Sequence, residues 1–261
     1  MKYALDSGFS TYYEENGDPN STTILLLHGI GLNHRMWKNQ IEPLTTAGFY
    51  VVAIDLYGHG KSSKLKKITL DNWNDQINDL MDHLEISKAI IIGVSMGGVI
   101  AQHFLIKHSS KVIKLIISDS FGELQTLKEK LLGSSQVVGF GIFKLLGVKT
   151  FAKAMRSTYK AEFAASAGEE IYNRSLEADF RQLILARKAI NKIDAIKDLS
   201  NINVQSLVIV GRNFGPFFIK INKKIADSLK DSRFIELDNS MDPSPLVNPD
   251  QFNKTVLAFI S

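Results

Sequence analysis

One segment of the chain carries a serine between glycines at a spacing that suits a nucleophile. Residues Ala89–Gly98 read as an apolar run followed by Gly-x-Ser-x-Gly, with Ser95 at its centre, and a helix is predicted directly afterwards. On a sharp strand-to-helix turn the two flanking glycines avoid collisions that side chains would suffer, and the serine hydroxyl is lifted clear of the sheet. Such a hydroxyl can attack a carbonyl carbon. Ser95 is therefore the first candidate catalytic residue.

Short apolar runs, each followed by a helical segment, predict the elements that must position this serine. Runs this short and continuous are typical of parallel strands that are covered on both faces. Their alternation with helices predicts a doubly wound sheet with right-handed crossovers, and residues 1–15 alternate loosely enough for an opening antiparallel pair. Strands are predicted at Ile24–Leu27, Tyr50–Ile54, Ala89–Ile92, Val112–Ile117, Ser206–Val210 and Phe234–Leu237, and helices at Met36–Thr46, Asn72–Leu84, Gly97–His108, Phe217–Leu229 and Pro249–Ile260.

The alternation stops between residues 122 and 198. This stretch has helical periodicity, for example at Phe180, Leu183, Ile184 and Arg187, and contains no strand-like run. We interpret it as a helical cap that is inserted after the sixth strand and folds over the carboxyl edge of the sheet. The α/β core then consists of residues 1–121 and 199–261.

Two further segments agree with the serine turn. Leu25–Gly31 is a strand that ends in His28-Gly29, and Val51–Ser62 is a strand followed by a glycine-rich turn. In this order and spacing the three segments resemble the α/β-hydrolase superfamily, especially its bacterial esterase and C–C hydrolase branch. The resemblance implies a mostly parallel α/β-hydrolase sheet and an ancestry among serine hydrolases of carboxylic esters.

The same resemblance implies further roles at this site. The backbone N–H groups of Ile30 and Met96 would form the oxyanion hole, which holds the negative charge that develops on a carbonyl oxygen. The acid of the catalytic triad would follow the seventh strand, where Phe214 stands, and the histidine would follow the eighth, where Asp242 stands after Met241. A serine is a poor nucleophile without an adjacent base and a group that orients it. Ester hydrolysis is therefore predicted to be weak or absent.

Other residues do not replace the triad. By the resemblance, His28 orients its loop and His59 belongs to a structural turn. His34 follows the oxyanion segment and is interpreted as a surface residue. Asp119, at the end of the sixth strand, could orient a histidine, but no histidine follows His108.

The pocket at the former triad positions is predicted to be apolar. Phe214 and Met241 would raise the pKa of Asp242 by desolvation, and a carboxylate deprived of water is a stronger base. The changes at these positions, with intact flanks, indicate a site that has been repurposed or engineered. Three hypotheses remain open: a weakened ester hydrolase, a catalyst in which Asp242 removes a proton from carbon, and a protein that binds a small ligand without turning it over.

Composition limits the partners of this chain. The net charge is +4, and the basic residues are scattered lysines rather than the arginine-rich stripe of a nucleic-acid reader. There is no cysteine, so disulfides and cysteine metal sites are excluded. No apolar run approaches the length of a membrane helix, and residues 1–10 lack the apolar region of a secretion signal. We expect a cytoplasmic protein with a small apolar substrate or ligand, and without a cofactor, a metal, a nucleic acid or a membrane partner. The sequence does not indicate the oligomeric state.

Overall fold

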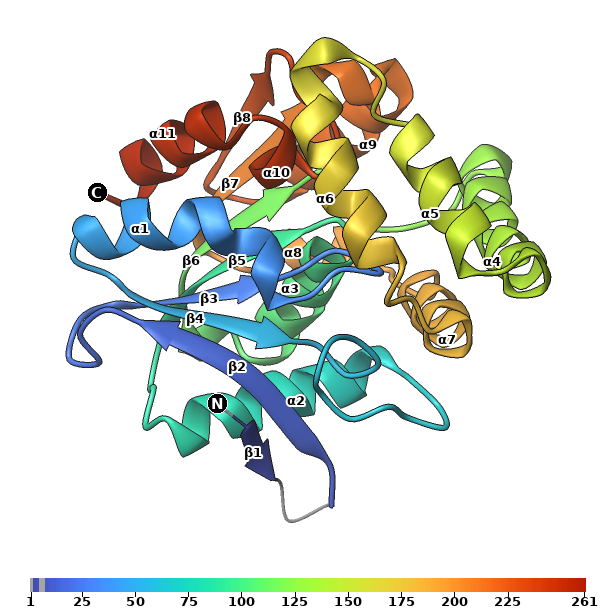
Figure 1. The fold of residues 1–261 in the computed structure, drawn as a ribbon. Helices are drawn as coiled ribbons and strands as arrows, with labels where there is room; N and C mark the ends of the chain where they lie inside the picture. Colours follow the sequence, from blue (N-terminus) through green and yellow to red (C-terminus); the bar gives the residue numbers. More distant parts are fainter. Residues whose placement is uncertain (1, 5–7) are drawn as a thin grey trace.

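A computed structural model describes residues 2–4 and 8–261, and an eight-stranded sheet runs through its centre (Figure 1). The strand order is β1-β2-β4-β3-β5-β6-β7-β8. β2 pairs antiparallel with β1 and β4, and all other pairs are parallel. The strands are β1 (Lys2–Ala4), β2 (Ser10–Asn16), β3 (Thr23–Leu27), β4 (Tyr50–Asp55), β5 (Ala89–Val94), β6 (Val112–Ser118), β7 (Gln205–Gly211) and β8 (Ser232–Leu237). The predicted mostly parallel sheet and its opening antiparallel pair are confirmed, whereas residues 1 and 5–7 of that prediction lie outside the described part.

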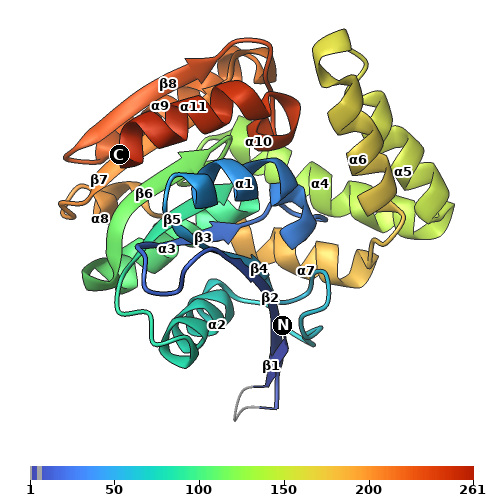
Figure 2. The same ribbon diagram turned by 60° about the vertical axis from the view of Figure 1, so that its left-hand side comes forward.

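Helices cover both faces of the sheet (Figure 2). One face carries α1 (Lys38–Thr46), α10 (Ser244–Val247) and α11 (Pro249–Ile260), which contact one another. The other face carries α2 (Leu70–His83), α3 (Met96–Lys107), α8 (Ile196–Leu199) and α9 (Pro216–Ser228). This arrangement explains why β3, β4 and β5 are buried at every position, since successive side chains point to opposite faces and both faces are covered.

The alternation of side chains along one strand divides the core in two. In β3, Leu25 and Leu27 pack into the hydrophobic cluster under α2 and α3. Ile24 and Leu26 pack into a second cluster with Trp37 of the loop before α1 and with the side chains of α11. All residues of β3 are buried, so a shift of one residue in its register would exchange the two cores.

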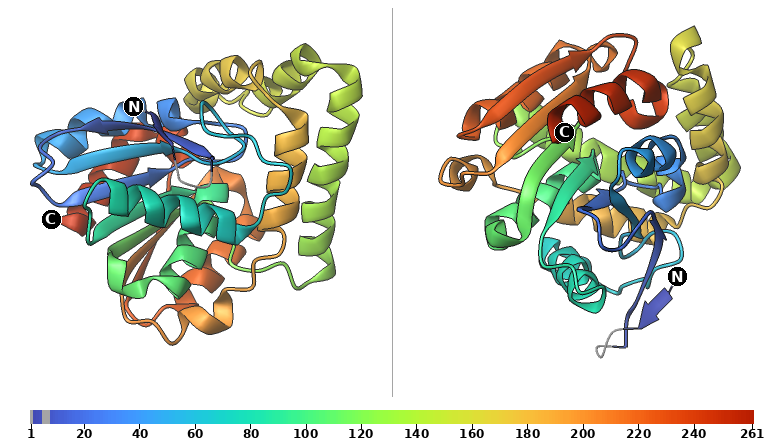
Figure 3. Two further views of the ribbon diagram at one scale, coloured as in Figure 1. Left: turned by 90° about the horizontal axis from the view of Figure 1, so that it is seen from below. Right: turned by 90° about the vertical axis from the view of Figure 1, so that its left-hand side faces the viewer.

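Four cap helices lie between β6 and β7, as a layer beyond the carboxyl ends of the strands (Figure 3). They are α4 (Leu127–Leu146), α5 (Val148–Ser157), α6 (Ala165–Ser175) and α7 (Phe180–Ile190). The two ends of the insertion meet, because Glu123 and Asp194 form an isolated β-bridge and the Ala195 amide donates to the Gly122 carbonyl at 2.8 Å.

The predicted elements differ from the structure mainly at their ends. The helix predicted at Met36–Thr46 is a 3-10 helix at His34–Trp37 followed by α1, because the Asn33 side chain accepts from the Arg35 amide and starts the turn earlier. The helix predicted at Pro249–Ile260 is α11, and its observed bounds are the same. Within the described residues, no helix is long and apolar enough to cross a membrane, and no group of side chains could hold a metal ion.

Candidate active site

Ser95 occupies a strained turn between β5 and α3. Its backbone torsions are φ 52° and ψ −114°, outside the ordinary helical and extended ranges. A Cβ added at Gly93 would lie 2.3 Å from the Gly97 carbonyl oxygen, and one added at Gly97 would lie 2.1 Å from the Leu27 carbonyl oxygen. Only glycine fits at either position. The turn predicted from these glycines is therefore present.

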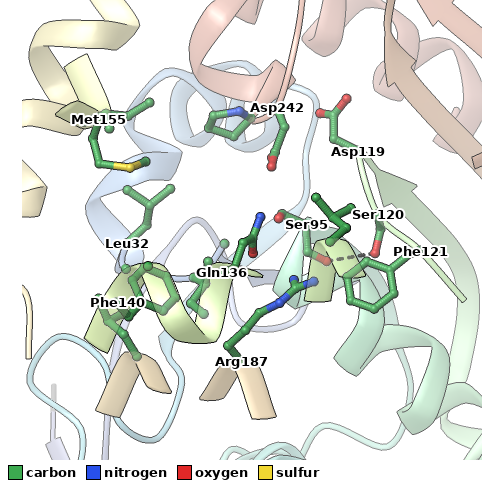
Figure 4. A pocket seen from close by; sticks show the side chains of 18 of the residues that line it. Leu32, Ser95, Asp119, Ser120, Phe121, Gln136, Phe140, Met155, Arg187 and Asp242 are labelled. Carbon is green, nitrogen blue, oxygen red and sulfur yellow. Dashed lines mark hydrogen bonds between the residues drawn. The ribbon is translucent and has the colours of Figure 1, made fainter. Parts of the chain in front are cut away.

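The neighbouring strand fixes the serine backbone. The Ser95 amide donates to the Ser118 carbonyl oxygen at 2.8 Å, and the Ser120 hydroxyl donates to the Ser95 carbonyl oxygen at 2.8 Å. The second of these bonds is the dashed line in Figure 4. Both bonds use the backbone of Ser95, and its side chain lines the space under the cap.

The loop after β3 packs directly against the nucleophile. A Cβ added at Gly29 would lie 3.6 Å from the Ser95 Cβ, and the next residue, Ile30, lines the same pocket. Met96 is the first residue of α3, and its amide therefore has no acceptor within the helix. Both amides expected to form the oxyanion hole thus flank Ser95.

A cavity of about 400 Å³ lies between the strand ends and the cap. The core side contributes Ser95, Asp119, Ser120 and Asp242, and the cap side contributes mainly apolar and aromatic residues. Such a cavity, apolar with a few converging polar groups, is typical of a site for a small molecule. The cap residues that line it include Leu132, Phe140, Phe143, Phe151, Met155, Tyr159, Ile171, Leu183 and Arg187.

Asp242 lines this cavity, and its carboxyl is directed toward Ser95 (Figure 4). The Tyr159 hydroxyl donates to the Asp242 backbone oxygen at 2.7 Å and ties the loop to the cap. Burial raises the pKa of Asp242 well above its usual range, and the carboxyl of Asp119 raises it further. The neighbouring Ser95 hydroxyl and the charge of Arg187 act in the opposite direction on this pKa, because both favour the ionised carboxyl. The direction expected from the sequence is confirmed.

Asp119 follows β6 and binds the backbone around Asp242. One carboxyl oxygen accepts from the Gly211 amide at 2.8 Å, and the other accepts from the Ser244 amide and the Ser118 hydroxyl, each at 2.8 Å. Burial raises the pKa of Asp119 as well, while these hydrogen bonds oppose the increase. Because Asp119 has more donors to its ionised form, the first proton taken up by the two carboxyls goes to Asp242.

Arg187 is a residue of the site that the sequence reasoning missed. It projects from α7 toward Ser95 (Figure 4), is 5% exposed, and lies over the Phe121 ring at 5.1 Å. Burial lowers its pKa to about 10, so the guanidinium remains charged at neutral pH. The sequence does contain a signal for it, because Arg187 stands on the same apolar stripe of the predicted helix as Phe180 and Leu183.

Of the two apolar residues at the former triad positions, one lines the cavity and the other does not. Phe214 lines the cavity as expected and stacks on Phe218 with ring centroids 3.7 Å apart. The placement of Met241 in the pocket is wrong. Its side chain packs against the core under α11, because its backbone is pressed against Gly211. The nearby cation Arg212 pairs with Glu236 and Asp238 and leaves Asp242 unneutralised.

The histidines near the site have structural contacts. His28 Nε2 accepts from the Leu56 amide at 3.0 Å, and its Nδ1 lies 2.8 Å from the Gly29 carbonyl oxygen. Burial lowers the pKa of His28 to about 4 and that of His59 to about 3. His34 is buried rather than exposed, lies outside the Ser95 cavity, and contacts Asp55 at 2.7 Å and Glu14 at 3.0 Å. Its interpretation as a surface residue is therefore wrong.

Known proteins resemble this chain over most of its length. The AB hydrolase superfamily protein YisY of Bacillus subtilis is 27% identical over 225 residues, which cover 83% of each chain. The 3-oxoadipate enol-lactonase 1 of Acinetobacter baylyi is 26% identical over 197 residues, or 75% of this chain and 73% of the relative.

Solved structures share the fold. An enol-lactonase from Burkholderia xenovorans superposes with a TM-score of 0.85 at 22% identity, covering 100% of this chain and 99% of the other. An esterase from Exiguobacterium antarcticum superposes with a TM-score of 0.87 at 20% identity, covering 100% and 98%. The sequence profile of the alpha/beta hydrolase fold matches residues 22–241. With its serine turn and strand order, the chain belongs to the alpha/beta hydrolase family.

Proposed function

We propose that this chain is a serine-hydrolase-like protein whose pocket binds a small, mainly apolar molecule, and that it hydrolyses esters slowly or not at all. The observation that carries the proposal is that the side chain directed toward Ser95 is the half-buried carboxyl of Asp242 rather than an imidazole. Relatives that are named as esterases and lactonases support the substrate-binding side of this proposal.

The chemistry of a carboxyl at this position explains the weak activity. The base of a triad takes the serine proton and returns it to the leaving group, and a third residue holds the base in place. Burial and the charge of Asp119 disfavour the ionised form of Asp242, which is the form that would have to take the serine proton. The hydrogen bonds of Asp119 go to Gly211, Ser244 and Ser118, and none of them orients the Asp242 side chain.

Hydrolysis of p-nitrophenyl acetate tests this proposal. The unmodified protein should turn the ester over slowly, and Asp242→His should raise kcat/KM at least ~100-fold, since it returns a base to a retained nucleophile. Adding Phe214→Asp should raise it further by orienting the new histidine. Asp238→His, on the exposed part of the same loop, is the matched control and should change nothing. Rapid hydrolysis by the unmodified protein that disappears in Ser95→Ala would disprove the proposal.

A second function is favoured by the same carboxyl. Once ionised, Asp242 is a stronger base than an exposed aspartate because its charge is poorly hydrated, and it faces an aromatic pocket that suits a flat carbon acid. With 1,2-benzisoxazole, removal of the ring C–H proton by Asp242 would drive cleavage of the N–O bond. The rate should rise with a single ionisation and vanish in Asp242→Asn. A rate equal to the buffer background at every pH would rule out this function and leave a binding pocket.

A further inference from the structure

The cap helix α4 exposes a row of large apolar side chains. The helix, drawn in yellow-green, forms the outer edge of the cap beyond α7 (Figure 3). Six of the nine large hydrophobic side chains that are exposed in the described part of the chain lie on α4. Five of them follow one another at intervals of three, four or seven residues, which places them on one side of the helix. These five, with exposed fractions between 51% and 87%, are Leu127, Leu131, Val138, Ile142 and Leu145.

The charges on this part of the cap are almost all of one sign. Residues 126–161, which contain α4 and α5, carry six lysines and one arginine but only one acidic residue, Glu129. Glu129 is buried and accepts hydrogen bonds from the backbone amides of Gln125 and Thr126, so it does not offset the lysines on the surface. The exposed lysines whose side chains form no ion pair or hydrogen bond with a described residue are Lys130, Lys144, Lys149, Lys153 and Lys160.

The turn between α4 and α5 combines the apolar and the basic side chains. Lys144 and Lys149 enclose the sequence Leu-Leu-Gly-Val, in which Leu145 is 87% exposed and Leu146 is 56% exposed. Gly147 has a φ of 87°, which lets the chain reverse sharply between the two helices. Residues 127–157, here called the α4–α5 hairpin, therefore present two leucines between two unpaired lysines at their tip.

The partner of this surface must accept both features. An exposed apolar patch of this kind marks an interaction site. A second copy of the chain is a poor partner, because unpaired lysines would meet unpaired lysines across the interface and the hairpin offers no exposed acid to pair with them. A nucleic acid would pair with the lysines but would leave the apolar row in water. An anionic lipid surface matches both, since its acyl region takes up leucine side chains and its phosphate groups attract lysines.

We propose that the α4–α5 hairpin docks this protein on the surface of an anionic lipid membrane, with α4 lying in the plane of the interface. The contact is peripheral, because no described helix is long and apolar enough to cross a membrane. It revises the expectation that no membrane is a partner, which was drawn from the lack of a spanning segment. The docking goes beyond the proposed function and does not depend on the chemistry at Ser95.

Sedimentation with lipid vesicles tests the docking. One set of vesicles consists of phosphatidylcholine alone, and the other of phosphatidylcholine and phosphatidylglycerol in equal parts. At low salt the unmodified protein should partition at least ~10-fold more strongly into the anionic vesicles, because several lysines close to a negative surface each favour binding. Added salt should weaken this binding, since it screens exposed charges.

Paired variants separate the hairpin from the overall charge. Replacing both tip leucines, by Leu145→Ser with Leu146→Ser, should reduce partitioning into anionic vesicles at least ~10-fold, because neither side chain would then enter the apolar region. Replacing both tip lysines, by Lys144→Gln with Lys149→Gln, should remove most of the preference for anionic vesicles. None of these four residues lines the Ser95 cavity.

The matched control removes the same charge from the opposite edge of the sheet. Lys88 and Lys230 are exposed and lie just before β5 and β8, at the amino ends of these parallel strands and away from the cap. The double variant Lys88→Gln with Lys230→Gln has the same net charge as the variant without the tip lysines. It should partition like the unmodified protein.

Several outcomes would overturn the docking proposal. They are no binding to anionic vesicles at low salt, equal partitioning into the two kinds of vesicle, and an equal loss of binding in the control and in the variant without the tip lysines. A dimer in sedimentation velocity that disappears when the tip leucines are replaced would assign this face to a second copy instead. If a variant does not fold, the two kinds of vesicle with the unmodified protein still decide. None of these results would alter the hydrolysis assay above, so failure of the docking and failure of the proposed function are distinguishable.

Discussion

The Asp119 carboxyl accepts the backbone N–H of Ser244 at 2.8 Å, two residues beyond Asp242. The buried Asp119 carboxyl thus holds the loop that carries Asp242, and its charge raises the pKa of the Asp242 carboxyl. The loop is fixed at two further points, because the Tyr159 hydroxyl donates to the Asp242 carbonyl oxygen and the Ser240 hydroxyl donates to the Ser244 hydroxyl.

Replacement of Asp119 by asparagine should destabilise the protein by about 1–3 kcal/mol. The amide nitrogen would replace an oxygen that accepts a buried hydrogen bond, so two donors would face each other at Gly211 or at Ser244. Chemical denaturation measures the loss. Asp238→Asn, in an exposed ion pair with Arg212, serves as the control and should cost less than about 1 kcal/mol. Equal stability of the two variants would show that Asp119 does not hold the loop.

The ionisation of Asp242 should make the folded state less stable as the pH rises. Its pKa is raised in the folded protein, so between the unfolded value and the folded value the native state binds more protons than the unfolded state. The free energy of unfolding therefore falls across that window, by about 1.4 kcal/mol for each pH unit that separates the two pKa values. Asp242→Asn cannot ionise and should be more stable than the unmodified protein at neutral pH, with the difference disappearing near pH 4. A constant difference at all pH values would contradict the raised pKa.

Two buried histidines should make the protein less stable as the pH falls, which is the opposite pH dependence to that of Asp242. The pKa of His28 is lowered to about 4 and that of His59 to about 3, so the unfolded state binds more protons than the native state below pH 6.5. Stability is therefore complete above that pH and is lost as the pH falls. His59→Gln should reduce the slope of unfolding free energy between pH 6 and 4 by about 1.4 kcal/mol per pH unit. An unchanged slope would mean that His59 takes up its proton while still folded.

The glycines of the serine turn should not tolerate a methyl group. Gly97→Ala would place Cβ 2.1 Å from the Leu27 carbonyl oxygen, so it should cost at least about 2–3 kcal/mol of stability and displace the nucleophile. Gly141→Ala in α4 is the matched change, because no atom lies within 4 Å of the added Cβ. It should stabilise the protein by roughly 0.5–1 kcal/mol, since glycine is a poor helix residue. Thermal unfolding of both variants measures whether Gly97→Ala lowers and Gly141→Ala raises the stability of the protein.

Local chemistry made the central part of the fold predictable. The apolar runs of β3 and β5 are read from the sequence because both faces of a parallel sheet are covered, so every position of these strands is buried and nearly all are apolar. The turn at Ser95 is equally local, because the steric demand falls on Gly93 and Gly97, which lie within two residues of the serine. The direction of the Asp242 pKa was also expected from the sequence, although of the two apolar residues invoked for it only Phe214 lines the cavity.

Packing between distant segments decided the rest of the site. Met241 and Asp242 are adjacent, yet only the contact of their loop with Gly211 determines that the first side chain enters the core and the second faces Ser95. His34 carries no sequence signal for burial, which results from its contacts with Glu14 and Asp55 of two different strands.

The sequence by itself determined the sheet, the serine turn and the residues at the former triad positions, because each depends on neighbours along the chain. Only the tertiary structure decided that Arg187 of the cap reaches the Ser95 cavity without a partner, and that Asp119 supports the loop of Asp242. The position of Arg187 depends on how α7 folds back over the strand ends. The local pattern places Arg187 on the buried stripe of its helix, but only long-range packing decides that this stripe faces Ser95.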